Sequence, residues 1–143
     1  TMSAAVEGAM ENIPSVGFSL YNYDADADFS TAQMVAEQII EKVISHEFPP
    51  YICLNVNVPD VSKEELKGIK MCKQANAFWE DRFDKRLDQF NNPYYWLTGN
   101  FEISENGEGT DLLAIEQGFA SCVPTQFDMT SYSALKLLKN WEK

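Results

Sequence analysis

The chain has 143 residues, a net charge of −11, and 45% hydrophobic and 23% charged residues. This length corresponds to a single domain. The acidic charge would repel a phosphate backbone, so we expect no binding to a nucleic-acid polymer. A small phosphorylated ligand is not excluded, because a bound divalent cation can reverse the local field. No apolar run is long enough to cross a bilayer, so we expect no membrane partner.

The first ten residues, TMSAAVEGAM, predict a small-residue helix over residues 2–12 with Thr1 as its capping hydroxyl and Pro14 at its end. In α/β proteins, a helix that follows a strand holds phosphates and other anions at its start. No such strand precedes this helix in the sequence. We therefore expect the chain to be the carboxy-terminal part of a larger enzyme whose reactive groups lie upstream. The following residues, 16–20, predict a short buried strand.

Residues 24–28 (DADAD) resemble the beginning of a calcium loop. An EF-hand needs glycine at the sixth position and glutamate at the twelfth, where this chain has Phe29 and Val35. The solvated-loop interpretation is therefore favoured. Ser30 and Gln33 then predict a capping box that starts a helix over residues 31–46.

Residues 51–58 (YICLNVNV) form the clearest predicted strand, in which apolar residues alternate with polar or small ones. Asn55 and Asn57 lie near its end, where they could contact a ligand at the carboxyl edge of a sheet. They could equally bond to the turn that begins at Pro59, and this second interpretation is favoured. A further strand is predicted over residues 68–73.

Three cysteines, Cys53, Cys72 and Cys122, show neither metal-binding nor redox spacing. Their odd number and apolar neighbours predict reduced, mostly buried thiols, which indicates a cytoplasmic location. The single histidine, His46, ends a predicted helix, where a cation interacts favourably with the carbonyl groups. We therefore predict no catalytic residue among these side chains.

Residues 78–101 are unusually aromatic and surround an Asn-Asn-Pro turn at residues 91–93. The aromatic side chains are Phe78, Trp79, Phe83, Phe90, Tyr94, Tyr95, Trp96 and Phe101. The pattern predicts a projecting β-hairpin arm. Because a thin arm cannot bury both faces against itself, we expect it to pack on a partner subunit. The alternatives are an arm folded back on its own domain and a base-stacking platform, which lacks its basic groove.

The remaining sequence predicts three further elements. With them, the chain is expected to divide into three parts. Helices are expected over residues 111–117 and 131–141, with a strand over residues 119–123 between them. Thr110 is the expected cap of the first of these helices and Gly118 its stop. The parts are residues 1–74 (α/β core), residues 75–105 (hairpin arm) and residues 106–143 (return to the core and a C-terminal oligomerisation helix).

Five segments, taken together and in this order, resemble the family of the stationary-phase survival protein SurE. They are TMSAAVEGAM, LNVNVP (54–59), KGIK (67–70), YYWLTG (94–99) and TDLLAIEQGFASCVP (110–124). The resemblance covers essentially the whole chain. It implies an α/β fold, here the C-terminal portion of a Rossmann-like domain with a protruding aromatic hairpin and a C-terminal helix. It also implies homodimers or homotetramers built through the hairpin arm and that helix.

The activity implied by the resemblance is hydrolysis of nucleoside 5′-monophosphates and related phosphate monoesters with Mg²⁺ or Mn²⁺. The family's metal ligands are two adjacent aspartates, a serine and an asparagine, all expected before Thr1. This chain has no Asp-Asp pair, so the sequence assigns it no metal ligand, and we expect it to be inactive alone. Thr1 matches the family's Ser-Gly-Thr turn at the phosphate site, so the resemblance implies that Thr1 binds substrate. The alternatives are a non-enzymatic oligomerisation module and a complete small protein that starts at Met2.

Overall fold

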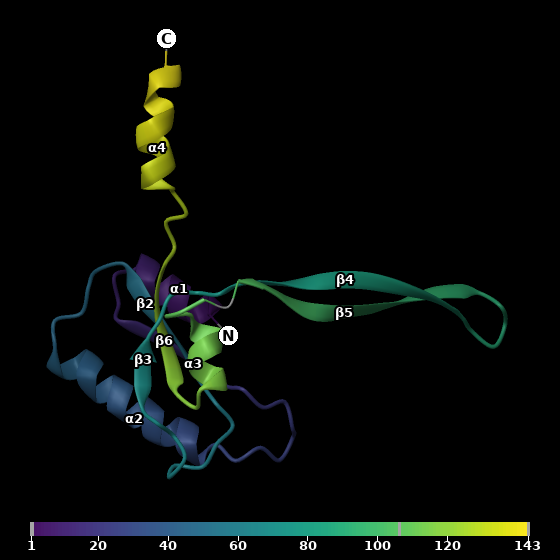
Figure 1. The fold of residues 1–143 in the computed structure, drawn as a ribbon, viewed down its shortest axis with the longest axis horizontal. Coiled ribbons are helices and arrows are strands. Elements are labelled where there is room, and N and C mark those ends of the chain that lie inside the picture. Colours follow the sequence, from purple (N-terminus) through teal and green to yellow (C-terminus); the bar gives the residue numbers. More distant parts are fainter. Residues whose placement is uncertain (1, 106, 143) are drawn as a thin grey trace.

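A four-stranded mixed sheet forms the centre of the computed structural model, which describes residues 2–105 and 107–142 (Figure 1). Its strands are β1 (Ser15–Leu20), β2 (Ile52–Val58), β6 (Ala120–Gln126) and β3 (Ile69–Met71), in that order. Strand β1 is parallel to β2, β6 is antiparallel to β2, and β3 is parallel to β6. The predicted α/β fold class is confirmed. Strand β3 is shorter than the predicted residues 68–73.

Helix α2 (Ser30–Ser45) covers one face of this sheet, and α1 (Ser3–Met10) and α3 (Asp111–Glu116) pack against the other. The α2 face holds the main core, in which Val35, Val56 and Val58 are fully buried and Ile39 is almost so. Cys53 lies on the opposite face, beneath α1. The two-sided alternation predicted for residues 51–58 is therefore confirmed.

Helix α1 approaches the sheet closely because small residues line the contact. Ala5 and Ala9 are buried, and a Cβ added to Gly17 of β1 would lie 2.6 Å from the Met2 sulfur. Such a distance is shorter than side chains tolerate, so a side chain at this position would require the flexible Met2 side chain to move.

The first helix ends at Met10, before the residue 12 that the sequence predicted. Asn12 adopts a left-handed conformation (φ 56°), and the amide of Ile13 donates to the Gly8 carbonyl at 2.8 Å. This is a common way for a helix to end, and it precedes Pro14, which was expected to end the helix. The capping role predicted for Thr1 concerns a residue outside those that the structure describes.

The predicted capping box at the start of α2 is wrong. The backbone amide and the hydroxyl of Ser30 both donate to the Asp28 carboxylate, at 2.8 and 3.0 Å, while Gln33 donates to Glu37. These two hydrogen bonds, the backbone one first, hold the pKa of Asp28 below its usual value. The hydrogen-bonding role that the sequence assigned to Gln33 is thus taken by Asp28. Asp28 belongs to the exposed loop before α2, which agrees with the solvated-loop interpretation of residues 24–28.

The start of α3 is organised by a buried carboxylate. Thr110 occupies the predicted cap position, but its hydroxyl donates to the Gly107 carbonyl at 2.8 Å. The carboxylate of Asp111 instead accepts from the backbone amide of Ala75 at 2.8 Å, which ties α3 to the base of the arm. Gly118 ends the helix with φ +82°, as predicted.

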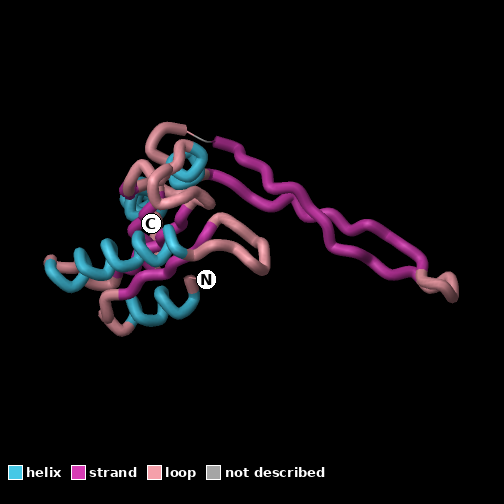
Figure 2. Tube along the Cα trace, turned by 90° about the horizontal axis from the view of Figure 1, so that it is seen from below, coloured by secondary structure: helices cyan, strands magenta, loops and turns pink. Residues whose placement is uncertain are grey.

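The aromatic segment forms a long hairpin of β4 (Asn76–Leu87) and β5 (Pro93–Glu105) that projects away from the core (Figure 2). Asp88 closes its tip by accepting from the amides of Phe90 and Asn92, both at 2.8 Å. Asn91 has a left-handed conformation there. The predicted arm is confirmed, and the alternative of an arm folded back on its own domain is wrong.

Helix α4 (Tyr132–Leu138) and a 3₁₀ turn (Lys139–Trp141) replace the single helix predicted over residues 131–141. Ser131 caps α4 by accepting from the amide of Ala134. The helix stands away from the sheet (Figure 1), and its apolar side chains are exposed: Tyr132, Leu135, Leu137, Leu138 and Trp141. Within residues 2–105 and 107–142, none of the helices has the length and apolar character needed to span a membrane.

All three cysteines are free and buried, as predicted. Burial in apolar surroundings disfavours the thiolate and therefore raises the pKa of each thiol, that of Cys122 to about 11.

We therefore predict that the folded chain resists alkylation by iodoacetamide at pH 8. The thiolate is the reacting form, and it is both scarce and covered here. The urea-unfolded chain, as the control, should take up three labels within the time in which the native chain takes up fewer than one. Rapid labelling of the native chain, read by intact mass, would contradict the buried placement.

Candidate functional site

Helix α1 runs antiparallel to β1, and its first turn packs near the middle of that strand. Gly8 packs against Ser15, whereas Met2 packs against Gly17, two residues further along β1. The amino terminus of α1 therefore points toward the carboxyl end of β1. The first amides of a helix have no partners within it, and together with the helix dipole they favour an anion at this end.

A row of polar side chains crosses the sheet at this edge, on the face that α1 and α3 cover. Ser19 on β1 pairs with Asn57 on β2, Asn57 pairs with Ser121 on β6, and Ser121 pairs with Lys70 on β3. Residues paired across neighbouring strands point to the same face. Ser19 lies two residues beyond Gly17, so the row begins just past the start of α1. We refer to these four residues as the polar row.

Two members of the polar row are bonded to each other, and one is not bonded. The Ser19 hydroxyl donates to Oδ1 of Asn57. The Ser121 hydroxyl is fully buried and finds no hydrogen-bond partner among the described residues. Leaving a buried hydroxyl unsatisfied costs about 1–3 kcal/mol. Because most buried polar groups are bonded, this exception indicates a partner that the described residues do not supply.

Lys70 places a positive charge at the end of the polar row. Its ammonium donates to the Gln117 side chain at 3.0 Å and lies 3.8 Å from the centre of the Phe119 ring. Both contacts hold the charge beside α3. In a chain with a net charge of −11, the polar row thus ends in a cation.

The interpretation in which Asn57 bonds to the following turn is wrong. Asn57 accepts from Ser19 in the neighbouring strand, and the turn is tied instead by Asn22, which donates to Asp60 at 2.9 Å. Strand pairing places Asn57 closer to a serine than to the turn. Asn55, also half-buried, lies on the same face, further from the carboxyl edge.

The described residues do not fit a metal site. Within residues 2–105 and 107–142, no group of three or more His, Cys, Asp or Glu side chains could hold a metal ion. The carboxylates near the carboxyl edge are engaged otherwise, Asp60 with Asn22 and Asp28 with Ser30. A divalent cation at this edge would need ligands from outside the described residues.

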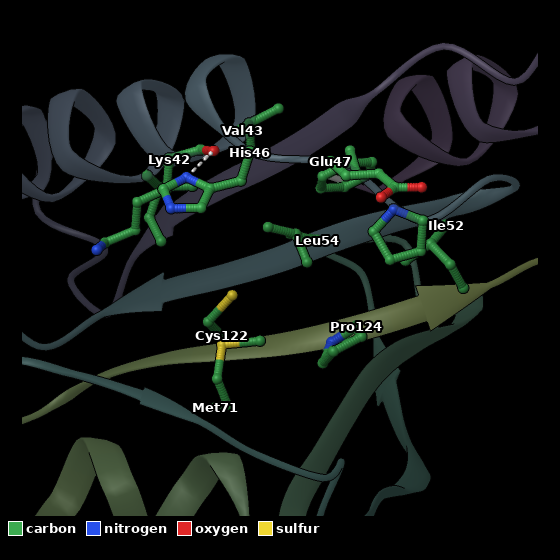
Figure 3. A pocket seen from close by; sticks show the side chains of 12 residues that line it. Lys42, Val43, His46, Glu47, Ile52, Leu54, Met71, Cys122 and Pro124 are labelled. Carbon is green, nitrogen blue, oxygen red and sulfur yellow. Dashed lines mark hydrogen bonds between the residues drawn. The ribbon is translucent and has the colours of Figure 1, made fainter.

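The opposite face of the sheet carries an apolar groove of about 320 Å³ beside the end of α2 (Figure 3). Met71, Cys122 and Pro124 form its floor, and His46 lies at its rim with Nδ1 3.1 Å from the Lys42 carbonyl. This contact at the end of α2 agrees with the helix-end role expected for His46. The raised pKa of Cys122 keeps its thiol protonated. The groove therefore offers no thiolate nucleophile.

Comparison with known proteins identifies the family. A sequence profile described as "Survival protein SurE" matches residues 1–81, more than half of the chain. The chain belongs to the SurE family. It is 49% identical to 5′-nucleotidase SurE of Flavobacterium psychrophilum and 46% identical to that of Flavobacterium johnsoniae, covering 99% of this chain and 55% of each relative. The crystal structure of the SurE protein from Aquifex aeolicus matches with a TM-score of 0.79 and 34% identity, covering 100% of this chain and 57% of that one.

The family resemblance is thus confirmed, and the chain spans about half the length of the SurE relatives it matches. Thr1, the one substrate-binding residue that the sequence assigned, lies outside the described residues. Ser19, Ser121 and Lys70 were not among the site residues that the sequence predicted. A signal existed, because a serine interrupts each of the apolar strand segments VGFSL and FASCV near a strand end.

We predict that Ser121→Ala leaves the free energy of unfolding unchanged or raises it by up to ~1 kcal/mol, because it removes a desolvated hydroxyl that has no partner. The control is Thr31→Val. The Thr31 hydroxyl is also buried but donates to the Val61 carbonyl at 2.8 Å, so its loss should cost about 1–2 kcal/mol. Urea denaturation of both variants is the measurement. A decrease of more than 1 kcal/mol in the free energy of unfolding for Ser121→Ala would show that this hydroxyl has a hydrogen-bond partner in the folded chain.

Proposed function

We propose that this chain is the carboxy-terminal part of a metal-dependent phosphatase that hydrolyses nucleoside 5′-monophosphates and related phosphate monoesters. The observation that carries the proposal is the buried, unpartnered Ser121 hydroxyl, in a polar row that begins just past the start of α1. The names of the relatives support the reaction class, since both Flavobacterium proteins are called 5′-nucleotidases.

The groups at this edge suit a phosphate ester. The free amides in the first turn of α1 are donors for phosphoryl oxygens. Lys70 lowers the cost of bringing a dianion to an acidic chain. In this proposal these groups bind and orient the ester, while the ligands of Mg²⁺ or Mn²⁺ come from outside the described residues.

An apolar strip beside β1 supports the part of the proposal that places further chain on this core. Val16 and Phe18 of β1 and Ile40 and Ile44 of α2 line a shallow groove at the outer edge of the described sheet. Ile44 is 79% exposed. An unpaired edge strand flanked by exposed isoleucines is a surface that folded proteins normally cover. We expect another segment of the complete phosphatase to lie there.

We also propose a cytoplasmic location. Three free, buried thiols are typical of a reducing compartment, where disulfides rarely persist. The odd number of cysteines also favours free thiols over disulfides.

The complete phosphatase should hydrolyse nucleoside 5′-monophosphates in the presence of Mg²⁺ or Mn²⁺, and the 143-residue chain alone should not. Lys70→Ala in the complete protein should lower kcat/KM roughly tenfold, the effect of one lost charge-assisted contact with the substrate. Lys42→Ala, which removes an exposed lysine of α2 on the opposite face of the sheet, is the control and should behave like the unchanged protein. The activity of both variants is measured as phosphate release across a range of substrate concentrations.

Two results would contradict this proposal. One is a metal-saturated complete protein without phosphatase activity. The other is metal-stimulated turnover by the chain alone, because it would place the metal ligands within these residues.

We further propose that the hairpin arm and α4 join copies of the chain into homodimers or homotetramers. Both elements project from the core and expose large apolar side chains, among them Trp79 at 62% and Trp141 at 77%. Apolar surface on this scale is typical of a protein interface. The same observation favours the alternative function of a non-enzymatic oligomerisation module, which the activity measurement separates from the phosphatase.

Replacing Tyr95 and Trp96 by serine should lower the mass of the oligomer, because these residues lie on opposite faces of the arm and an interface on either face would lose an aromatic contact. Light scattering across protein concentrations is the measurement. An unchanged mass would show that the arm is not an interface.

A further inference from the structure

The first residue after β1, Tyr21, lies on the same face of the sheet as the polar row. Its backbone amide donates to the Val58 carbonyl at 2.8 Å, so the ladder between β1 and β2 continues to this residue. Because side chains alternate along a strand, Tyr21 shares the face of Ser19, whereas Leu20 between them packs in the core beneath α2. At about 3.3 Å per residue, Tyr21 lies about 7 Å beyond Ser19 along the strand.

The Tyr21 side chain is half exposed and lacks a specific partner. Within residues 2–105 and 107–142, its ring takes part in none of the aromatic pairs and its hydroxyl in none of the hydrogen bonds. The exposed fraction of the side chain is 52%, so part of the ring is covered and part faces solvent. A buried aromatic ring removes ~150–250 Å² from water, so the open part of this ring offers apolar area to a flat ligand.

The backbone on both sides of the Tyr21 ring is held by hydrogen bonds. The ladder bond to Val58 fixes it on one side. On the other side, the Asn22 amide group donates to Asp60 at 2.9 Å, and Oδ1 of Asn22 accepts from the backbone amide of Asp24 at 2.7 Å. A side chain on a fixed backbone loses less freedom when a ligand binds, which increases its contribution to affinity.

The charges around Tyr21 favour an uncharged group over the ring. The loop that follows it is exposed and carries Asp24, Asp26 and Asp28, and Asp60 lies on the turn bonded to this loop. These carboxylates repel a further anion at this end of the sheet. A nucleobase is flat and neutral, so it fits beside the acidic loop where a second phosphate does not.

The start of α1 and the loop before α2 lie on the same side of the core (Figures 1 and 2). The amino terminus of α1 points toward the carboxyl end of β1, where this loop begins. A ligand whose phosphate lies at the first turn of α1 therefore extends along Ser19 toward Tyr21.

We propose that the Tyr21 ring stacks on the nucleobase of a nucleoside 5′-monophosphate whose phosphate lies at the start of α1. This proposal rests on the proposed function and adds the residue that distinguishes a nucleotide from other phosphate monoesters. Stacking uses the face of the base, which purines and pyrimidines both have, so the site accepts either class. Tyr21 contributes to substrate binding and takes no part in the cleavage of the phosphate ester.

The test is steady-state kinetics of the complete protein with its metal, with adenosine 5′-monophosphate as substrate and ribose 5-phosphate as a competing ligand without a base. Tyr21→Ala should raise KM for the nucleotide roughly tenfold and leave kcat within about twofold, because stacking holds the substrate and the transition state equally. The inhibition constant of ribose 5-phosphate should stay within about twofold, since this ligand makes no stacking contact. Tyr21→Phe keeps the face of the ring and should behave like the unchanged protein.

Tyr23→Ala is the matched control, because it removes the same type of side chain two residues further along, where the side chain is 94% exposed. It should leave KM and the inhibition constant unchanged. The assignment is overturned if Tyr21→Ala leaves KM unchanged, lowers kcat instead, or weakens ribose 5-phosphate as much as the nucleotide. It is also overturned if Tyr23→Ala has the larger effect.

The proposed function fails in a different way. A metal-saturated complete protein that does not hydrolyse the nucleotide at all would contradict the proposed function and, with it, the role of Tyr21. Hydrolysis that is unaffected by Tyr21→Ala would leave the proposed function in place and contradict only the stacking.

Discussion

The pairing of β2 with its two neighbours is the constraint on which both faces of the core depend. Strand β2 lies between β1 and β6, and its alternation sends Val56 and Val58 toward α2 and Cys53 and Asn57 toward the other face. A slip of one residue would turn each valine to the polar side and each polar group into the core. The burial of the valines therefore fixes the position of the asparagine.

The same register sets the chemistry of the carboxyl edge. Because Asn57 is held opposite Ser121, a hydroxyl is buried where the sheet could have placed an apolar side chain at no cost. Proteins retain such unfavourable groups mainly where function requires them. The start of α1 lies beside the row and Lys70 ends it, so amide donors and a cation share one side of the sheet. The α2 face, by contrast, is packed mainly with apolar side chains.

The sequence predicted the elements where a regular pattern or a strong local signal existed. Alternation revealed β2, and the aromatic run around Asn91 and Asn92 revealed the arm. Helix starts were less predictable, because Ser30 and Gln33 formed a reasonable capping box until Asp28 proved to be the acceptor. Whether Ser30 bonds to Asp28 or to Gln33 depends on the conformation of the loop, which a sequence motif does not specify. Ser121 could not be assigned because its lack of a partner follows from the packing of strands far apart in the sequence.

The central claim is that the edge where α1 begins receives the phosphate of the substrate. Hydrogen exchange of the backbone amides in the complete protein, with and without a nucleoside 5′-monophosphate and its metal, tests this claim most directly. We expect slower exchange with ligand in the first turn of α1 and around Asn57 and Ser121. Protection confined to the end of α2 and to Met71, which border the apolar groove, would place the ligand on the opposite face and contradict this assignment.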